Sequence, residues 1–367
     1  MNQPVRTTLQ KHSERLVPFV GRGPVDVHRR PRQVALRVGG VVALLVLLLV
    51  AGQVLDIARL LTLEEALALA AFAMASNLLI GYGGLVSFGQ AAFFGIGSYT
   101  VALGWLHWQL SFWLALVIAP LIGGAVAGII GLLALRSRRL YFALLTLAFS
   151  QLCYVLAQER YTFTQGANGV IGPMLPDSLI DPRHAYLFVL AVAAAAALVL
   201  WKITTSPFGL VLRATRENRE RMQALGVNVF GHQLLAFVIS GAFCSLAGVL
   251  FVVYSQSAYP ELLDWTQSGY AVYMVVIGGM FTFLGPALGA GVYTFANQYL
   301  AQHTSDWQLI LGLILLVIVL FRPDGLAGLL SPRPWRSAAR RLQARFGQQE
   351  DSTTDTTDPD RTTGELP

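Results

Sequence analysis

Residues 66–106 read ALALAAFAMASNLLIGYGGLVSFGQAAFFGIGSYTVALGWL and contain no charged side chain. As a single α-helix this stretch would be about 60 Å long, about twice the hydrocarbon thickness of a bilayer. It is therefore predicted to cross a membrane twice. The break between the two crossings is placed at Gly81-Tyr82-Gly83-Gly84, where glycines weaken a helix.

The rest of the chain has the same apolar character. Hydrophobic residues make up 55% of the 367 residues and charged residues 13%, against about 25% charged residues in soluble domains. The hydrocarbon core of a bilayer has no water to hydrogen-bond unpaired backbone N–H and C=O groups. The chain is therefore expected to cross the membrane as helices. The predicted fold class is an all-α, polytopic membrane helix bundle with about ten transmembrane helices. The spans are residues 38–55, two within 66–106, 112–135, 140–158, 186–201, 233–254, two within 265–302 divided between 278–279 and 285–286, and 307–321.

The basic residues indicate how this bundle is oriented. Arg residues gather before residue 38, at 136–139, in the loop 202–221 and after residue 321, whereas the alternate loops are mainly acidic. Since cytoplasmic loops retain Lys and Arg, both the N- and C-termini are predicted to be cytoplasmic. The net charge of +6 then reflects topology, and no nucleic-acid partner is expected. The predicted regions are a basic cytoplasmic N-terminal tail (1–34), a transmembrane domain (35–330) and a cytoplasmic, largely disordered C-terminal tail (331–367).

The chain lacks the motifs of ATP hydrolysis and of common enzymes. Neither Lys11 nor Lys202 lies in a GxxxxGK[ST] pattern, and the sequence has no HExxH, no GxSxG and no Cys/His cluster with ligand spacing. Cys153 and Cys244 lie in apolar runs and are predicted to be buried free thiols. No enzyme activity, cofactor or metal is therefore expected. ATP-driven transport by this chain would need ATPase activity from another chain.

Small and polar residues gather around the first break and in a later cassette. GGMFTFLGPALGAGVY at 278–293 echoes GGLVSFGQAAFFGIGSY at 83–99. Small residues allow close packing of membrane helices, and broken Gly-rich helices also line transport paths. The sequence leaves both roles open, a translocation path or helix packing. The candidate residues are Asn77, Gly84, Ser87, Gln90, Gly95, Gly97, Gly278, Gly279 and Gly285.

The loop SPFGLVLRATRENRERMQALGVNVFGHQLLAF, residues 206–237, is long for a connection between spans. Charges of both signs from residue 213 to 221 are followed by Met222, Leu225 and Gly226. This pattern predicts a short charged helix with a small apolar face, ended by Gly226. A solvated loop is the alternative, but the spacing favours a helix that docks on a partner. Its candidate residues are Arg216, Glu217, Glu220, Ala224, Leu225 and Gly226.

Several separated segments together resemble the LivM-type permease of ABC importers for branched-chain amino acids. The resemblance covers roughly residues 61–330 and keeps the order of segments in that family. The segments are NLLIGYGGLVSFGQAAFFGIGSYT at 77–100, LYFALLTLAFSQ at 140–151, TQGANGVIG at 164–172, SPFGLVLRATREN at 206–218, ALGVN at 224–228, LLAFVISGAFCSLAGVL at 234–250, YMVVIGGMFTFLGPALGA at 273–290 and LFRPDGLAGLL at 320–330.

The resemblance implies a multi-pass subunit in the inner membrane of a bacterium. Its implied partners are two ATPase subunits at the cytoplasmic face, a second, LivH-type permease subunit, and a periplasmic or lipid-anchored substrate-binding protein. In ABC permeases, a pattern of EAA, three residues and Gly forms a coupling helix that docks in a groove of the ATPase. Glu220 and Gly226 match its Glu and Gly, whereas Arg221 and Met222 replace the two Ala.

The resemblance implies leucine, isoleucine or valine as substrate. The same architecture also serves urea, short amides and aromatic acids, which stay as alternatives. A stand-alone ion-coupled carrier is a remoter alternative. Such carriers hold an ionisable group inside the membrane, whereas the nearest acids here, Glu64 and Glu65, are predicted to lie at the outer end of a span.

Overall fold

The computed structural model of the chain describes residues 43–44, 46–137, 139–172, 174–304, 306–321 and 325–328. The predicted tails, 1–34 and 331–367, lie outside these residues. The chain forms two compact units, Met1–Val54 and Leu55–Pro367. In the first unit, residues 43–44 and 46–54 are helical, within the first predicted span.

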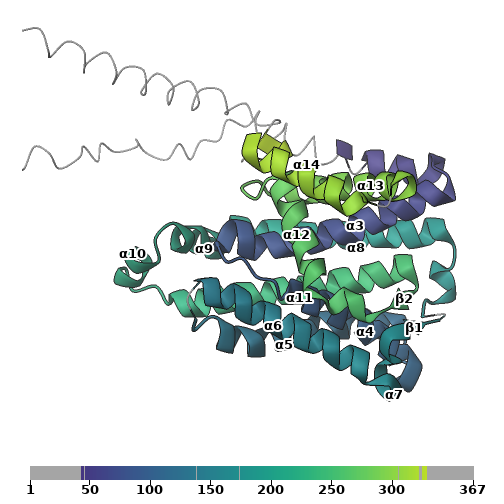
Figure 1. The fold of residues 1–367 in the computed structure, drawn as a ribbon, viewed down its shortest axis with the longest axis horizontal. Helices are drawn as coiled ribbons and strands as arrows, with labels where there is room; N and C mark the ends of the chain where they lie inside the picture. Colours follow the sequence, from purple (N-terminus) through teal and green to yellow (C-terminus); the bar gives the residue numbers. More distant parts are fainter. Residues whose placement is uncertain are drawn as a thin grey trace, which may run out of the picture. The chain divides into compact units, whose positions relative to one another are not determined.

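The second unit is built almost entirely of helices (Figure 1). In the described part of this unit, β-structure is limited to β1 (Val170–Ile171) and β2 (Ser257–Ala258), which pair antiparallel. The helices are α3 (Ile57–Asn77), the π-helix η1 (Leu78–Gly83), α4 (Gln90–Trp108), α5 (Phe112–Ala134), α6 (Arg139–Glu159), α7 (Tyr161–Thr164), η2 (Gly166–Asn168), η3 (Asp177–Leu179), α8 (Pro182–Thr205), α9 (Pro207–Glu217), α10 (Arg219–Ala224), α11 (Val229–Ser255), η4 (Pro260–Leu263), α12 (Trp265–Gly278), α13 (Gly285–His303), α14 (Trp307–Phe321) and η5 (Leu326–Gly328).

Among the described helices, 5 are long and apolar enough to cross a membrane: Ile57–Gly83, Phe112–Ala134, Leu140–Glu159, Pro182–Thr205 and Val229–Ser255. Two of these, α3 with η1 and α11, are 83% and 72% buried inside the protein. The other three are at most 33% buried and leave apolar faces for lipid. α11 packs against α3, α4 and α5, so the two most buried spans lie together at the centre of the unit.

Both breaks in the long apolar stretches are confirmed. The first stretch leaves its helix at Gly83 and resumes at Gln90, and the second leaves at Gly278 and resumes at Gly285. The span that starts at Trp265 ends at the predicted break, so α12 has only 14 residues. A straight helix of that length rises about 21 Å, less than the hydrocarbon thickness of about 30 Å.

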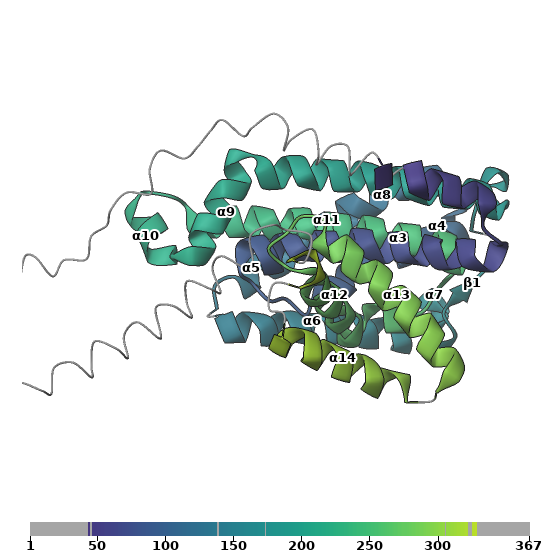
Figure 2. The same ribbon diagram turned by 90° about the horizontal axis from the view of Figure 1, so that it is seen from above.

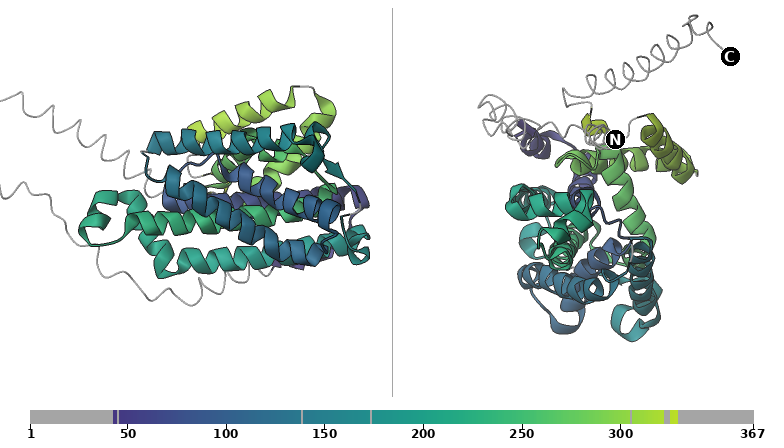
Figure 3. Two further views of the ribbon diagram at one scale, coloured as in Figure 1. Left: turned by 90° about the horizontal axis from the view of Figure 1, so that it is seen from below. Right: turned by 90° about the vertical axis from the view of Figure 1, so that its left-hand side faces the viewer.

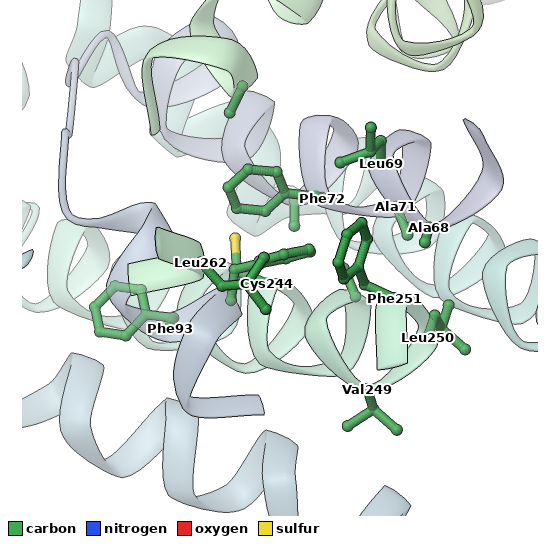
Figure 4. Close-up of a cluster of buried hydrophobic side chains, with 14 of the residues drawn as sticks. Ala68, Leu69, Ala71, Phe72, Phe93, Cys244, Val249, Leu250, Phe251 and Leu262 are labelled. Carbon is green, nitrogen blue, oxygen red and sulfur yellow. The ribbon is translucent and has the colours of Figure 1, made fainter. Parts of the chain in front are cut away.

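Aromatic rings from three helices fill the core of this unit. The Phe94 ring on α4 lies with its centroid 4.6 Å from that of Phe72 on α3 and 5.5 Å from that of Phe251 on α11. Figure 4 shows Phe72 on α3 and Phe251 on α11 in one buried cluster that also holds Cys244. Cys244 is a buried free thiol as predicted, whereas the free thiol of Cys153 is only half-buried.

Polar side chains cap several helices that begin at the ends of the unit. Ser111, Asp181, Asn228 and Asp264 each accept a hydrogen bond from a backbone N–H in the first turn of α5, α8, α11 and α12. Such caps replace water at N–H groups that have no partner within the helix. In this unit most of the long helices run side by side, with α10 at one end and β1 and β2 at the other (Figures 1 and 2).

Candidate functional site

The loop between α8 and α11 forms two short helices that extend beyond the ends of the long ones (Figure 3). α9 and α10 meet at Asn218, whose backbone is extended and whose side chain accepts a hydrogen bond from the N–H of Arg221 at 2.8 Å. Asn218 thus ends α9 and starts α10. The predicted single charged helix is therefore two helices with a corner between them.

Gly226 ends α10, as the sequence predicted. Its φ of +80° is a left-handed conformation that L-residues with side chains rarely adopt. The N–H of Val227 donates to the carbonyl oxygen of Met222 at 3.1 Å, and that of Gly226 to Gln223 at 2.9 Å. These two bonds form a Schellman motif, which satisfies carbonyl groups at the end of a helix.

Most of the predicted docking residues are exposed on this corner. Glu217, Glu220, Ala224 and Gly226 are all exposed, and the Leu225 side chain is 71% exposed. They form a surface of acidic and apolar groups around the end of α10. We call these five residues the α10 tip.

Arg216 differs from the α10 tip because its side chain points into the bundle. Its Nη1 donates a hydrogen bond to the carbonyl oxygen of Gly81 in η1. The guanidinium carbon lies 4.6 Å from the centroid of the Phe281 ring, in the segment between α12 and α13. Arg216 therefore contacts both helix breaks from the last turn of α9.

The two breaks also contact each other. The Asn77 side chain and the carbonyl oxygen of Met280 both lie close to Gly81. A Cβ at residue 81 would overlap with them. In the second break, Gly278 lies directly against the carbonyl of Gly285. Gly279 has a φ of +108° and lies beside Gly325, where a Cβ would be 2.5 Å from the Gly279 Cα. These contacts bring residues about 200 positions apart into one cluster of glycines.

The polar candidates near the first break are buried. Asn77 is 2% exposed, and Ser87 and Gln90 are each 1% exposed. Gln90 Oε1 accepts hydrogen bonds from Ser240 Oγ at 3.1 Å and from Cys244 Sγ at 3.0 Å. Within the described residues, Asn77 Oδ1 and Gln90 Nε2 have no hydrogen-bond partner. The structure thus holds two polar atoms with unused hydrogen-bonding capacity beside the break.

The glycines of α4 lie against two different neighbours. Gly97 lies directly against the backbone carbonyl of Ser245 on α11, so a side chain at residue 97 would overlap with backbone atoms. Gly95 lies against the side chain of Leu263 in η4. A flexible leucine can move more readily than a backbone can, and the two sites therefore tolerate added volume differently.

Glu64 is a buried acid near the N-terminal end of α3. Its side chain is 1% exposed, and no hydrogen-bond partner for Oε1 occurs among the residues that the structure describes. It lies in the second turn of α3, within the apolar span Ile57–Gly83. The sequence predicted a position at the end of a span, and it could not predict burial there, because burial depends on which helices cover that turn. The structure shows an acid enclosed by its neighbours.

A family model described as "Branched-chain amino acid transport system / permease component" matches residues 57–320. The match includes both helix breaks, α9 and the α10 tip. The chain belongs to this family. In the described part of the permease, no group of three or more His, Cys, Asp or Glu residues could hold a metal ion.

Named relatives of the permease are transport proteins. The LivM permease protein of the high-affinity branched-chain amino acid transport system is 27% identical in Salmonella typhimurium and 28% identical in Escherichia coli. Each match covers 70% of this chain and 67% of the relative. The LivH permease protein of the Escherichia coli system is 24% identical, over 71% of this chain and 91% of the relative. No solved structure matches the chain significantly.

Sequence reasoning placed the candidate residues in two separate groups, and the structure brings the groups together. Arg216 was assigned to the docking loop and Gly84 to the glycine-rich break, yet a Cβ on Gly84 would lie 2.5 Å from Arg216 Cγ. The signal that could have indicated this contact is the pair Arg213 and Arg216. Arg216 lies four residues after Leu212 and on the same face of α9, and Leu212 is fully buried.

Proposed function

We propose that this permease is one of two membrane subunits of an ABC importer for a branched-chain amino acid. Separate ATPase chains at the cytoplasmic face would power it, and a periplasmic or lipid-anchored binding protein would deliver substrate. A LivH-type chain would be the second permease subunit. The similarity to both LivM and LivH proteins supports this arrangement. The proposed location is the inner membrane of a bacterium, and the chain is proposed to have no enzyme activity of its own.

The observation that carries this proposal is the α10 tip. It offers an exposed helix end with Glu220 and Gly226 at the spacing of the ABC coupling pattern. Asn218 and Gly226 define its two ends through hydrogen bonds to the backbone. The chain has a built surface on which a partner can dock and no ATP-binding motif in its sequence. Force would therefore come from the partner.

The proposed topology has ten spans with both termini in the cytoplasm. The ten spans are the five apolar helices together with residues 38–55, α4, α12, α13 and α14. The alternation of Arg-rich and acidic loops supports the orientation. The α10 tip then faces the cytoplasm, and β1 and β2 face the opposite side.

We further propose that the two breaks lie beside the translocation path. Glycines at 84, 278, 279 and 285 would let the chain change direction there, and Asn77, Ser87 and Gln90 would supply polar groups when the bundle moves. The unpartnered atoms of Asn77 and Gln90 support this role. Gly95 and Gly97 would serve helix packing, since they lie against Leu263 and Ser245.

The test is transport by the purified assembly in lipid vesicles. The chain is co-expressed with its ATPase chains and a LivH-type subunit, the binding protein is supplied, and uptake of labelled leucine, isoleucine and valine is measured with and without ATP. Urea, acetamide and phenylacetate serve as competitors. We expect ATP-dependent uptake of the labelled amino acid. Unlabelled leucine, isoleucine and valine should each inhibit this uptake. Uptake by this chain alone, driven by an ion gradient, would overturn the proposal.

A further inference from the structure

α9 connects the α10 tip to the interior of the bundle through one face. Leu212 is fully buried and lies near Gly83, whose Cβ position is 3.7 Å from Leu212 Cδ1. One residue further, the Arg213 guanidinium carbon lies 5.2 Å from the centroid of the Tyr82 ring. Arg216 follows one turn later with its bond to Gly81. This face of α9 therefore packs along the whole end of η1.

The chemistry of the Arg216 contact fits a helix end. Gly81 lies in the last turn of η1, where carbonyl groups have no following N–H within the helix. The end of a helix also carries a partial negative charge, which attracts a cation. Arg216 supplies both a donor and a positive charge at that point.

Gly84 and Phe281 complete the surroundings of this side chain. Gly84 has a φ of +66° and no side chain, and the aliphatic part of Arg216 occupies the space beside it. The Phe281 ring, at 4.6 Å from the guanidinium carbon, comes from the second break. A planar guanidinium is able to stack on a ring and donate a hydrogen bond at the same time, which an ammonium group does less well.

We propose that Arg216 is a positioning residue that transmits movement of the α10 tip to both helix breaks. Only Asn218 and Glu217 separate Arg216 from α10, so displacement of α10 moves its guanidinium. Because that group holds Gly81 and Phe281 together, η1, which leads into the first break, and the segment 279–284 of the second break move with it. The inference rests on the proposed function, since it requires an ATPase that docks on the α10 tip.

Two variants test this link against a matched control. Arg216→Gln removes the charge and the ring contact, and Phe281→Leu removes the ring contact alone. Arg219→Gln, at an exposed position on α10, is the control for loss of one positive charge near the tip. Three quantities are measured for each: co-purification of the ATPase chains, the rate of ATP hydrolysis, and ATP-dependent uptake in vesicles.

The expected result is uncoupling. Arg216→Gln should keep ATPase association and hydrolysis while the amount of substrate transported per ATP falls about tenfold, within the usual range of coupling between sites. Phe281→Leu should lower the same ratio by a smaller factor, and Arg219→Gln should leave it unchanged. If Arg216 had only a structural role, Arg216→Gln would lower the yield of assembled protein. The protein that does assemble would transport as much substrate per ATP as the wild type.

Failure of this inference differs from failure of the proposed function. If the wild-type assembly shows no ATP-dependent uptake, the proposed function is wrong. If the wild type transports and Arg216→Gln has the wild-type ratio, the proposed link is wrong. Should Arg216→Gln fail to assemble, Phe281→Leu decides the matter, and a wild-type ratio in that variant overturns the link.

Discussion

Ser98 on α4 donates a hydrogen bond of 3.0 Å to the carbonyl oxygen of Gly248 on α11. Gly248 itself lies directly against the backbone carbonyl of Phe94, one turn earlier on α4. The two helices thus approach each other backbone to backbone. Such contacts between membrane helices rely on small residues, because lipid gives no hydrophobic drive for association.

This close approach predicts a graded response to added methyl groups on α4. Gly97→Ala should destabilise the protein by about 1–3 kcal/mol, because its Cβ meets the backbone of Ser245. Gly95→Ala should cost less, since the Leu263 side chain can rotate away. The measurement is the midpoint of thermal unfolding in detergent.

Gly291 on α13 provides the control for these variants, because no described atom lies within 4 Å of its Cβ position. Gly291→Ala should change stability by less than about 0.5 kcal/mol, as surface substitutions usually do. Equal midpoints for Gly97→Ala and Gly291→Ala would show that α4 and α11 are not in backbone contact.

The α10 tip predicts that Gly226 is needed for docking. Gly226→Trp places a bulky residue at φ +80°, where a side chain costs about 1–3 kcal/mol, and it obstructs the exposed surface. Among the residues that the structure describes, no atom lies within 4 Å of the Gly226 Cβ position, so membrane insertion should be unaffected. Co-purification of the ATPase chains and ATP-dependent uptake should both fall.

Gly226→Asn is the matched control, since Asn tolerates the left-handed conformation better than other residues with side chains do. It should retain most of the association with the ATPase chains. Wild-type association and uptake in Gly226→Trp would mean that this loop is not the coupling element.

Glu220→Ala should weaken coupling less than Gly226→Trp does. Glu220 is exposed, and an exposed ion pair with a partner is usually worth under about 1 kcal/mol, or roughly fivefold in affinity. The affinity for the ATPase chains is measured at low and high salt. A loss larger than this, or one that does not diminish at high salt, would indicate that Glu220 is buried in the complex.

The sequence predicted those features of the fold that depend on neighbours along the chain. The breaks follow from uncharged stretches too long for one crossing, and the end of α10 follows from Gly226 after an apolar residue. The place of Arg216 could not be predicted in this way. In the sequence it is one charge among several in a loop, and its partners are Gly81 and Phe281, 135 and 65 residues away. The burial of Glu64 could not be predicted for the same reason, because it results from helices that pack from elsewhere in the chain.

The proposed orientation predicts which cysteines can be labelled from each side of the membrane. In a Cys153→Ser, Cys244→Ala background, Ser137→Cys and Asn218→Cys should react with an impermeant maleimide only from the cytoplasm. Asn168→Cys, in η2 at the opposite end from α10, should react from outside. The background without added cysteines should not react. Labelling of Asn218→Cys in intact cells would exclude the ten-span arrangement.

Glu64 distinguishes an ATP-driven importer from a carrier that is coupled to an ion. An ionised carboxylate enclosed in the bundle without a partner for Oε1 is unfavourable, so the neutral Glu64→Gln should be at least as stable as the wild type. In an ATP-driven importer this variant should also keep its ATP-dependent uptake. In an ion-coupled carrier a buried acid is the usual coupling site, and its loss abolishes transport.

Glu65→Gln, at a half-buried neighbouring position, is the control for a change of charge at this end of α3. Loss of uptake in Glu64→Gln, with Glu65→Gln active and both variants folded, would show that Glu64 takes part in transport and would contradict a path powered by ATP alone.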